Sequence, residues 1–185
     1  MAFEIPEGLH PRLLPLAWMV GRWEGVGTVE HPSMPVHRFH QILEITQDGR
    51  SFLSFTSRTW TLDDASRDRA AETMETGYLR VAPSAEEAPR IVTVEMVVAH
   101  PTGIVEVYTG TGGEGKVELV TDLVARTATG PDYTAGKRLI GLVNGDFMWA
   151  YDIAGFGHPL TSYASAHLKR ANDLATASDS TASDS

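Results

Sequence analysis

Apolar and polar residues alternate through most of the chain with the period of two that β-strands require. The pattern is clearest where Val92, Val94, Met96 and Val98 share one face and the residues between them share the other. Comparable segments predict ten strands, over residues 23–30, 36–46, 51–60, 72–81, 90–99, 103–111, 115–121, 137–144, 146–154 and 160–169. The pattern therefore predicts an all-β protein.

Turn-forming residues separate these segments, as in Gln47-Asp48-Gly49 and Pro101-Thr102-Gly103. The sharpest signal is Asn144-Gly145, because Asn-Gly between two apolar runs is typical of a two-residue hairpin. Short strands joined in order by tight turns form an antiparallel meander, which can close into a barrel and so remove exposed edges. We predict an antiparallel ten-stranded up-and-down β-barrel with room inside for a small ligand or a flat cofactor.

The remaining segments complete one predicted domain over residues 1–171. Residues 10–20 indicate a short apolar helix or turn, whereas 61–71 and 82–89 indicate exposed loops. Residues 122–136 fit either a strand or a loop. Residues 172–185 consist mainly of Ala, Ser, Thr and Asp, which bury too little apolar surface to order a chain, so we predict a disordered acidic tail.

A glycine-punctuated stretch, Gly21-Arg22-Trp23-Glu24-Gly25-Val26-Gly27, opens the first predicted strand. It matches a phosphate-binding loop only weakly, because such loops open a helix and the residues after Gly27 favour a strand. We interpret it as a structural corner where glycines permit positive φ and close backbone approach. Trp23 is expected to fill the closed end of the barrel, beneath a cation such as Arg170.

Composition and charge exclude several kinds of function. The 185 residues include no cysteine, which excludes disulfides, zinc–thiolate sites and iron–sulfur clusters. The formal net charge of -9 argues against nucleic-acid and anionic-membrane partners. Neither a secretory signal nor a membrane span is apparent, so a cytoplasmic location is expected. Hydrolase motifs such as G-x-S-x-G and H-E-x-x-H do not occur.

Four pieces of the sequence carry a family resemblance: the apolar lead-in 16–20, the G-x-W-x-G-x-G pattern from Gly21 to Gly27, the segment 75–80, and the closing segment 157–170. With them the chain resembles the nitrobindin family of lipocalin-like and fatty-acid-binding-protein-like barrels, over about residues 11–171. The resemblance implies ferric haem b near the open end, held by one histidine on the last strand. It also implies nitric oxide binding, isomerisation of peroxynitrite to nitrate, and a possible homodimer.

Tyr163 stands where the resemblance places the iron-binding histidine, when the last strand is aligned on Pro159, Leu160, Ala166 and Leu168. A tyrosine phenolate is an accepted axial ligand of ferric haem, but it needs a nearby positive charge to ionise at neutral pH. Three hypotheses follow. The chain is a nitrobindin-like protein with lost or altered haem binding, a carrier of another small hydrophobic ligand without catalysis, or a haem enzyme with tyrosinate ligation.

Two further residues are candidates for contact with haem or another ligand. On a strand His167 shares a face with Tyr163, although about 13 Å away, and it is an alternative iron ligand. Ser33 lies at the rim, where the resemblance places a polar residue that contacts haem.

Other polar residues carry weaker expectations. His100 and His158 fall in predicted turns and are expected to face water. Glu75 and Arg80 have opposite parity on one strand, so each is expected to find its partner elsewhere.

Overall fold

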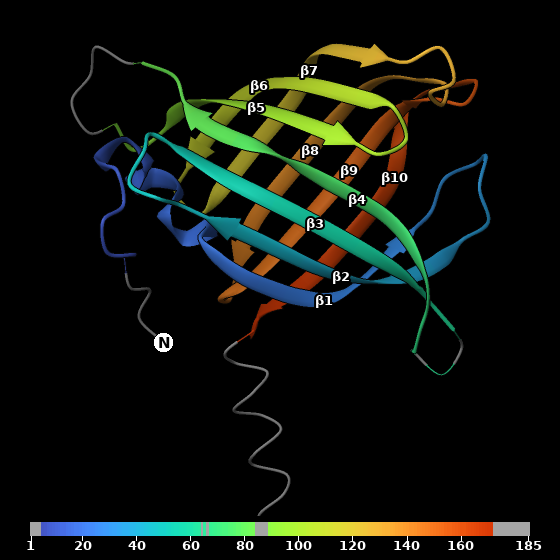
Figure 1. Cartoon of the computed structure of the whole chain (residues 1–185), viewed down its shortest axis with the longest axis horizontal. Coiled ribbons are helices and arrows are strands. Elements are labelled where there is room, and N and C mark those ends of the chain that lie inside the picture. Colours follow the sequence, from blue (N-terminus) through green and yellow to red (C-terminus); the bar gives the residue numbers. More distant parts are fainter. Residues whose placement is uncertain (1–4, 64, 66, 84–88, 172–185) are drawn as a thin grey trace, which may run out of the picture.

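Ten antiparallel strands close into a barrel in the computed structural model (Figure 1). The structure describes residues 5–63, 65, 67–83 and 89–171. The strands are β1 (Gly21–Val29), β2 (His37–Thr46), β3 (Phe52–Leu62), β4 (Asp68–Val81), β5 (Val92–His100), β6 (Ile104–Gly113), β7 (Lys116–Arg126), β8 (Tyr133–Val143), β9 (Asp146–Gly155) and β10 (His158–Arg170). Each strand pairs with the next in sequence, and β10 pairs with β1. The predicted ten-stranded antiparallel barrel is confirmed, whereas the predicted tail, 172–185, lies outside the described residues.

A 3₁₀-helix, η1 (Pro11–Met19), covers one end of the barrel, at the left of Figure 1. Proline at its first position suits a helix start, where the missing N–H has no partner to lose. Leu13 and Leu16 are fully buried against the strands. The predicted apolar helix or turn at 10–20 is confirmed, and no helix in the described residues is long and apolar enough to cross a membrane.

Tight two-residue turns join several neighbouring strands. Asn144 and Gly145 have φ values of 54° and 90°, as a type I′ hairpin turn requires, and Val143 pairs directly with Asp146. This confirms the predicted Asn-Gly hairpin. The ambiguous stretch 122–136 resolves into the end of β7 at Arg126 and the start of β8 at Tyr133.

The glycine-rich start of β1 forms the corner that the sequence predicts. Trp23 is fully buried, its Nε1 donates to the Met19 carbonyl at 2.9 Å, and its ring lies 5.2 Å from that of Phe147. The Arg170 Cζ lies 4.1 Å from the Trp23 ring, which confirms the expected cation–π contact. Gly27 lies under the Phe39 ring, where a Cβ would come within 2.6 Å of Cε2.

A β-bulge interrupts β10 between Ser162 and Ala164. The extra residue shifts the alternation, so Tyr163 and Ala164 both line the interior, and the buried face then continues through Ala166. His167 consequently points outward. The expectation that Tyr163 and His167 share a face is therefore wrong, because it assumed an unbroken strand.

The ladder between β7 and β8 is short. It joins Lys116–Val120 to Lys137–Gly141, near the η1 end. Toward the other end β7 continues to pair with β6 and β8 with β9. Just beyond the last paired residues of β7 and β8, the Gly136 N–H donates a hydrogen bond to Thr121 Oγ1 at 3.0 Å.

Candidate functional site

The barrel encloses a cavity that opens at the end away from η1, and the empty space in and around it, open solvent included, is about 970 Å³. The half nearer η1, called here the deep half, is lined by apolar side chains: Met19, Leu43, Ile45, Leu53, Phe55, Leu79, Met96, Ile140 and Phe147. The mouth half combines aromatic and polar side chains: Phe39, Thr59, Glu72, Thr73, Glu75, Arg138, Tyr151 and Tyr163. Apolar walls with a few convergent polar groups are typical of small-molecule sites.

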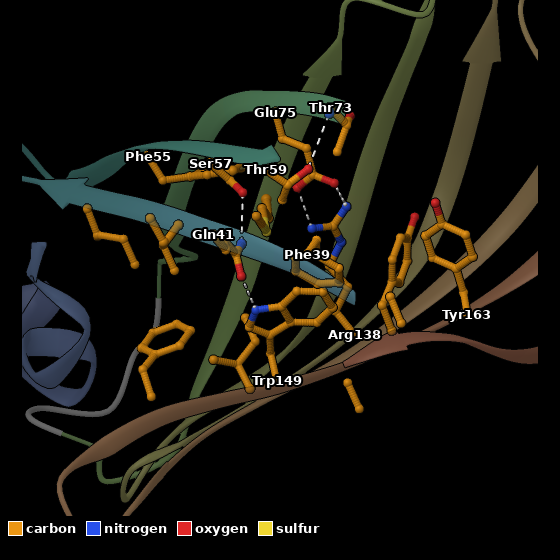
Figure 2. Close-up of a pocket in the computed structure, with 18 of the residues that line it drawn as sticks. Phe39, Gln41, Phe55, Ser57, Thr59, Thr73, Glu75, Arg138, Trp149 and Tyr163 are labelled. Carbon is orange, nitrogen blue, oxygen red and sulfur yellow. Dashed lines mark hydrogen bonds and ion pairs between the residues drawn. The ribbon is translucent and has the colours of Figure 1, made fainter. Parts of the chain in front are cut away.

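Between the two halves, three hydrogen-bonded side chains form what we call the Gln41 bridge (Figure 2). Gln41 Nε2 donates to Ser57 Oγ at 2.8 Å, and Trp149 Nε1 donates to Gln41 Oε1 at 2.8 Å. The bridge runs from Ser57 of β3 through Gln41 of β2 to Trp149 of β9, and β1 and β10 lie between β2 and β9 in the barrel.

Arg138 and Glu75 form an ion pair on the wall of the mouth half (Figure 2). Arg138 donates to both oxygens of Glu75, at 2.8 and 3.1 Å, and its guanidinium lies 4.3 Å from the Tyr151 ring. Burial alone would lower the pKa of Arg138, but Glu75, Glu106 and neighbouring tyrosines raise it well above its ordinary value. Arg138 is therefore a permanent cation whose charge is already balanced.

Behind Arg138, Glu106 is fully buried at the centre of a polar cluster. Its Oε1 accepts the hydroxyls of Tyr108 at 2.6 Å, Tyr151 at 2.7 Å and Tyr133. Its Oε2 contacts His100 Nε2 at 2.7 Å and Arg138 Nη2 at 3.1 Å. Burial alone would raise the pKa of Glu106, but the hydrogen bond from His100 and the charge of Arg138 hold it well below its ordinary value.

The three tyrosines of this cluster remain protonated donors, because burial raises their pKa values, that of Tyr108 to about 12. Gly136 makes space for them. A Cβ at Gly136 would collide with the Tyr133 hydroxyl and come within 2.9 Å of Tyr151 Cε2 and 3.1 Å of the Tyr108 hydroxyl. Only glycine fits at this point of β8.

Tyr163 lines the mouth of the cavity at the bulge in β10. Its ring packs at a right angle to Tyr151, with 5.7 Å between centroids, and none of the described residues hydrogen-bonds its hydroxyl. Burial raises the pKa of the Tyr163 phenol, and the negative charges of Glu72 and Glu75 raise it further. The phenol therefore keeps its proton at neutral pH.

His31 lies behind Tyr163, with 6.1 Å between the ring centroids, and is 3 % exposed. Its Nδ1 accepts the Ser33 N–H at 3.2 Å, so the proton is on Nε2, which has no partner among the described residues. Burial lowers the pKa of His31, and so does the neighbouring His158. His31 is thus a neutral packing residue of the rim and does not line the cavity.

The other two predicted site residues lie away from the cavity lining. Ser33 Oγ donates to the Phe156 carbonyl at 3.2 Å, which ties the β1–β2 loop to the β9–β10 turn. His167 lies on the outer surface with its Nε2 2.5 Å from Asp146 Oδ2. The structure thus brings Tyr163 to the cavity but neither Ser33 nor His167.

The structure tests two further expectations, one about the exposure of His100 and one about the partners of Glu75 and Arg80. His100 is drawn inward by Glu106 and its side chain is only 12 % exposed, so the expectation that it faces water is wrong. Glu75 and Arg80 do find separate partners, Arg138 and Glu95.

The sequence reasoning missed Glu106 and Gln41. Both stand at inward positions of a strand alternation, Glu106 between Ile104 and Tyr108, and Gln41 between Phe39 and Leu43. A polar residue in the apolar phase of a strand is the signal that could have revealed them.

The cavity offers little to a metal ion. The described residues contain no group of three or more histidines, aspartates or glutamates able to hold one. None of the described residues that line the cavity is a histidine.

The sequence of this chain is similar to a known protein family and to several known proteins. Residues 12–170 match the family model described as "THAP4-like, heme-binding beta-barrel domain". A "Ferric nitrobindin-like protein" of Kineococcus radiotolerans is 49% identical over 166 residues, covering 85% of this chain and 92% of that protein. A "Peroxynitrite isomerase" of a Nocardioides species is 41% identical over 170 residues, covering 92% of this chain and 99% of that protein.

A solved structure has the same architecture. The crystal structure of Rv2717c from M. tuberculosis superposes with a TM-score of 0.75 and 28% sequence identity, covering 88% of this chain and 98% of that one.

Proposed function

The chain belongs to the nitrobindin family, and from that premise we propose that it binds a small, largely apolar molecule in its barrel cavity without holding haem iron through a protein ligand. The observation that carries this proposal is Tyr163, which occupies the cavity mouth where the resemblance calls for the iron-binding histidine.

The residues present do not fit a ferric haem. Iron would need the phenolate form of Tyr163, but burial and the carboxylates of Glu72 and Glu75 raise the pKa of that phenol. Iron would supply a positive charge of its own, but the basic residue among the described residues of the cavity wall, Arg138, adds none because it is already bonded to Glu75 and Glu106. We therefore propose that this chain does not carry out the haem-dependent peroxynitrite isomerisation that the resemblance implies.

The cavity suits another small molecule. Its deep half is apolar, and its mouth half adds aromatic faces and a few hydroxyl groups. Burial of apolar surface supplies the affinity, at about 25 cal/mol per Å², and the polar groups orient the ligand.

A hemin titration of the purified protein, of Tyr163→Phe and of Tyr163→His tests the iron part of the proposal. We expect wild type and Tyr163→Phe to give the same broad, weak Soret band. Tyr163→His should give a sharp Soret band and bind hemin at least about tenfold more tightly, because a neutral imidazole then faces the cavity.

Tyr78→His is the matched control, because Tyr78 lies on the outer face of β4 and is 54% exposed. It should leave the hemin titration unchanged. A sharp Soret band in wild type that disappears in Tyr163→Phe would overturn the proposal in favour of tyrosinate ligation.

A further inference from the structure

The structure points to the size and shape of the ligand, if the cavity binds one as proposed above. We propose that the Gln41 bridge is a floor that confines the ligand to the mouth half and selects compact ring-shaped molecules over long alkyl chains.

The bridge is a chain of two hydrogen bonds inside the barrel. Gln41 and Ser57 are 4% and 6% exposed, and both bonds of the bridge measure 2.8 Å. The same cavity continues past the bridge, so a long chain that enters the deep half passes alongside the Gln41 amide and displaces it where the two overlap. The Trp149 N–H and the Gln41 amide would then be left buried without partners, which is costly.

The deep half alone would favour the opposite ligand. Every side chain that lines it is apolar, among them Leu53, Met96 and Phe147. An alkyl chain matches such a surface, and each buried methylene contributes about 0.8 kcal/mol. The bridge is therefore the element that decides between a ring and a chain.

The mouth half presents flat surfaces that suit a ring. Phe39 and Trp149 are stacked with an interplanar angle of 24°, and Tyr151 and Tyr163 stand at 87° to each other. Offset and edge-to-face contacts with such rings favour an aromatic ligand.

The charged side chains of the cavity wall further restrict the class of ligand. Glu72 and Glu75 both lie on the cavity wall, and Arg138, already paired, is the one basic residue among the described residues that line it. A ligand carboxylate would be repelled there. The class that fits is an uncharged or cationic ring compound rather than a fatty acid.

Two uncharged dyes, prodan and laurdan, test the floor directly. They share one naphthalene fluorophore and differ in the length of the acyl chain, so a cavity open to its full depth would bind laurdan more tightly. We expect wild type to bind prodan at least about tenfold more tightly than laurdan. Gln41→Ala should raise the affinity for laurdan, so that the ratio of prodan affinity to laurdan affinity falls by at least about tenfold.

Trp149→Phe is the second variant, because it removes the Nε1 donor while keeping an aromatic ring, and it should also admit laurdan. Gln47→Ala is the matched control, since Gln47 is a glutamine far from the cavity whose side chain bonds the Glu7 carbonyl. It should leave both affinities unchanged.

The outcomes separate this inference from the proposed function. If neither dye binds wild type, the proposed small-molecule site is overturned. If wild type binds laurdan as tightly as prodan, or if both bridge variants leave the ratio of affinities unchanged, the floor is overturned while the binding cavity stands.

Discussion

Trp23 joins three parts of the closed end through one side chain. It bonds the last residue of η1, packs on Phe147 of β9 and lies beneath Arg170 of β10. Arg170 in turn donates to the carbonyls of Val20 and Trp18, so the cation is held over the ring. A single aromatic residue thus fastens the helix to the strands that close the barrel.

We predict that Trp23→Ala lowers the free energy of unfolding by about 3–5 kcal/mol, because it leaves a large cavity in a fully buried site. Urea denaturation measures the loss. Trp60→Ala is the control, since Trp60 lies on the outer face against His40. Equal stability of Trp23→Ala and wild type would contradict the structural role of Trp23.

The side-chain contacts of this protein fall into two groups, those between residues close in the sequence and those between residues far apart in it. Trp23 and its glycines form a local motif that is readable in the sequence. Gln41 and Trp149 are 108 positions apart, and Arg138 and Glu75 are 63 apart, so their meeting depends on how the whole barrel closes. No local pattern encodes such pairs, which is why the sequence revealed Tyr163 but not its polar surroundings.

At the scale of the strand, β10 shows what alternation can and cannot predict. The strand itself was predicted, and the alternation holds from Ala164 to Leu168. The bulge at Tyr163 carries no glycine or proline to mark it, so the sequence did not reveal the change of face that separates Tyr163 from His167.

The short ladder between β7 and β8 leads to a prediction about how well backbone amides are protected from exchange. Residues Lys116–Val120 have strand partners on both sides, whereas Leu123–Arg126 pair with β6 only. Alternate amides of Leu123–Arg126 should therefore exchange with deuterium faster than any amide of Lys116–Val120. Amide exchange followed by NMR measures this, and uniform protection along β7 would contradict it.

At the scale of the whole molecule, the Glu106 cluster fastens the mouth of the barrel as Trp23 fastens the closed end. The Glu106 carboxylate of β6 contacts His100 of β5, Arg138 of β8 and Tyr151 of β9. His100 and Arg138 in turn pair with Glu75 of β4. Strands that are not neighbours are thereby held at fixed distances around the cavity.

We predict that Glu106→Gln lowers the free energy of unfolding at neutral pH by about 3–5 kcal/mol, because Arg138 loses a buried carboxylate. The pKa of Glu106 is depressed by folding, so its stabilising contribution is complete above the unfolded-state pKa near ~4.3 and declines as the pH falls below it. The difference between wild type and variant should therefore shrink in acid. Urea denaturation at neutral and acidic pH checks this, and a difference independent of pH would contradict it.

The overall architecture was the part most accessible from sequence. Strand number, antiparallel order and closure follow from alternation and turn residues repeated along the chain, so an error in one segment does not change the result. The predicted homodimer has no such internal repetition to support it and stays a prediction.

The position of Trp149 in the cavity has a consequence for the fluorescence of the protein. All four tryptophans lie in the described part of the chain: Trp18 and Trp23 are sealed in the closed end, Trp60 is on the outer face, and Trp149 alone lines the cavity. A ligand that contacts Trp149 inside the barrel will therefore change the ultraviolet emission of this residue directly. The protein thus carries its own label-free indicator of occupancy.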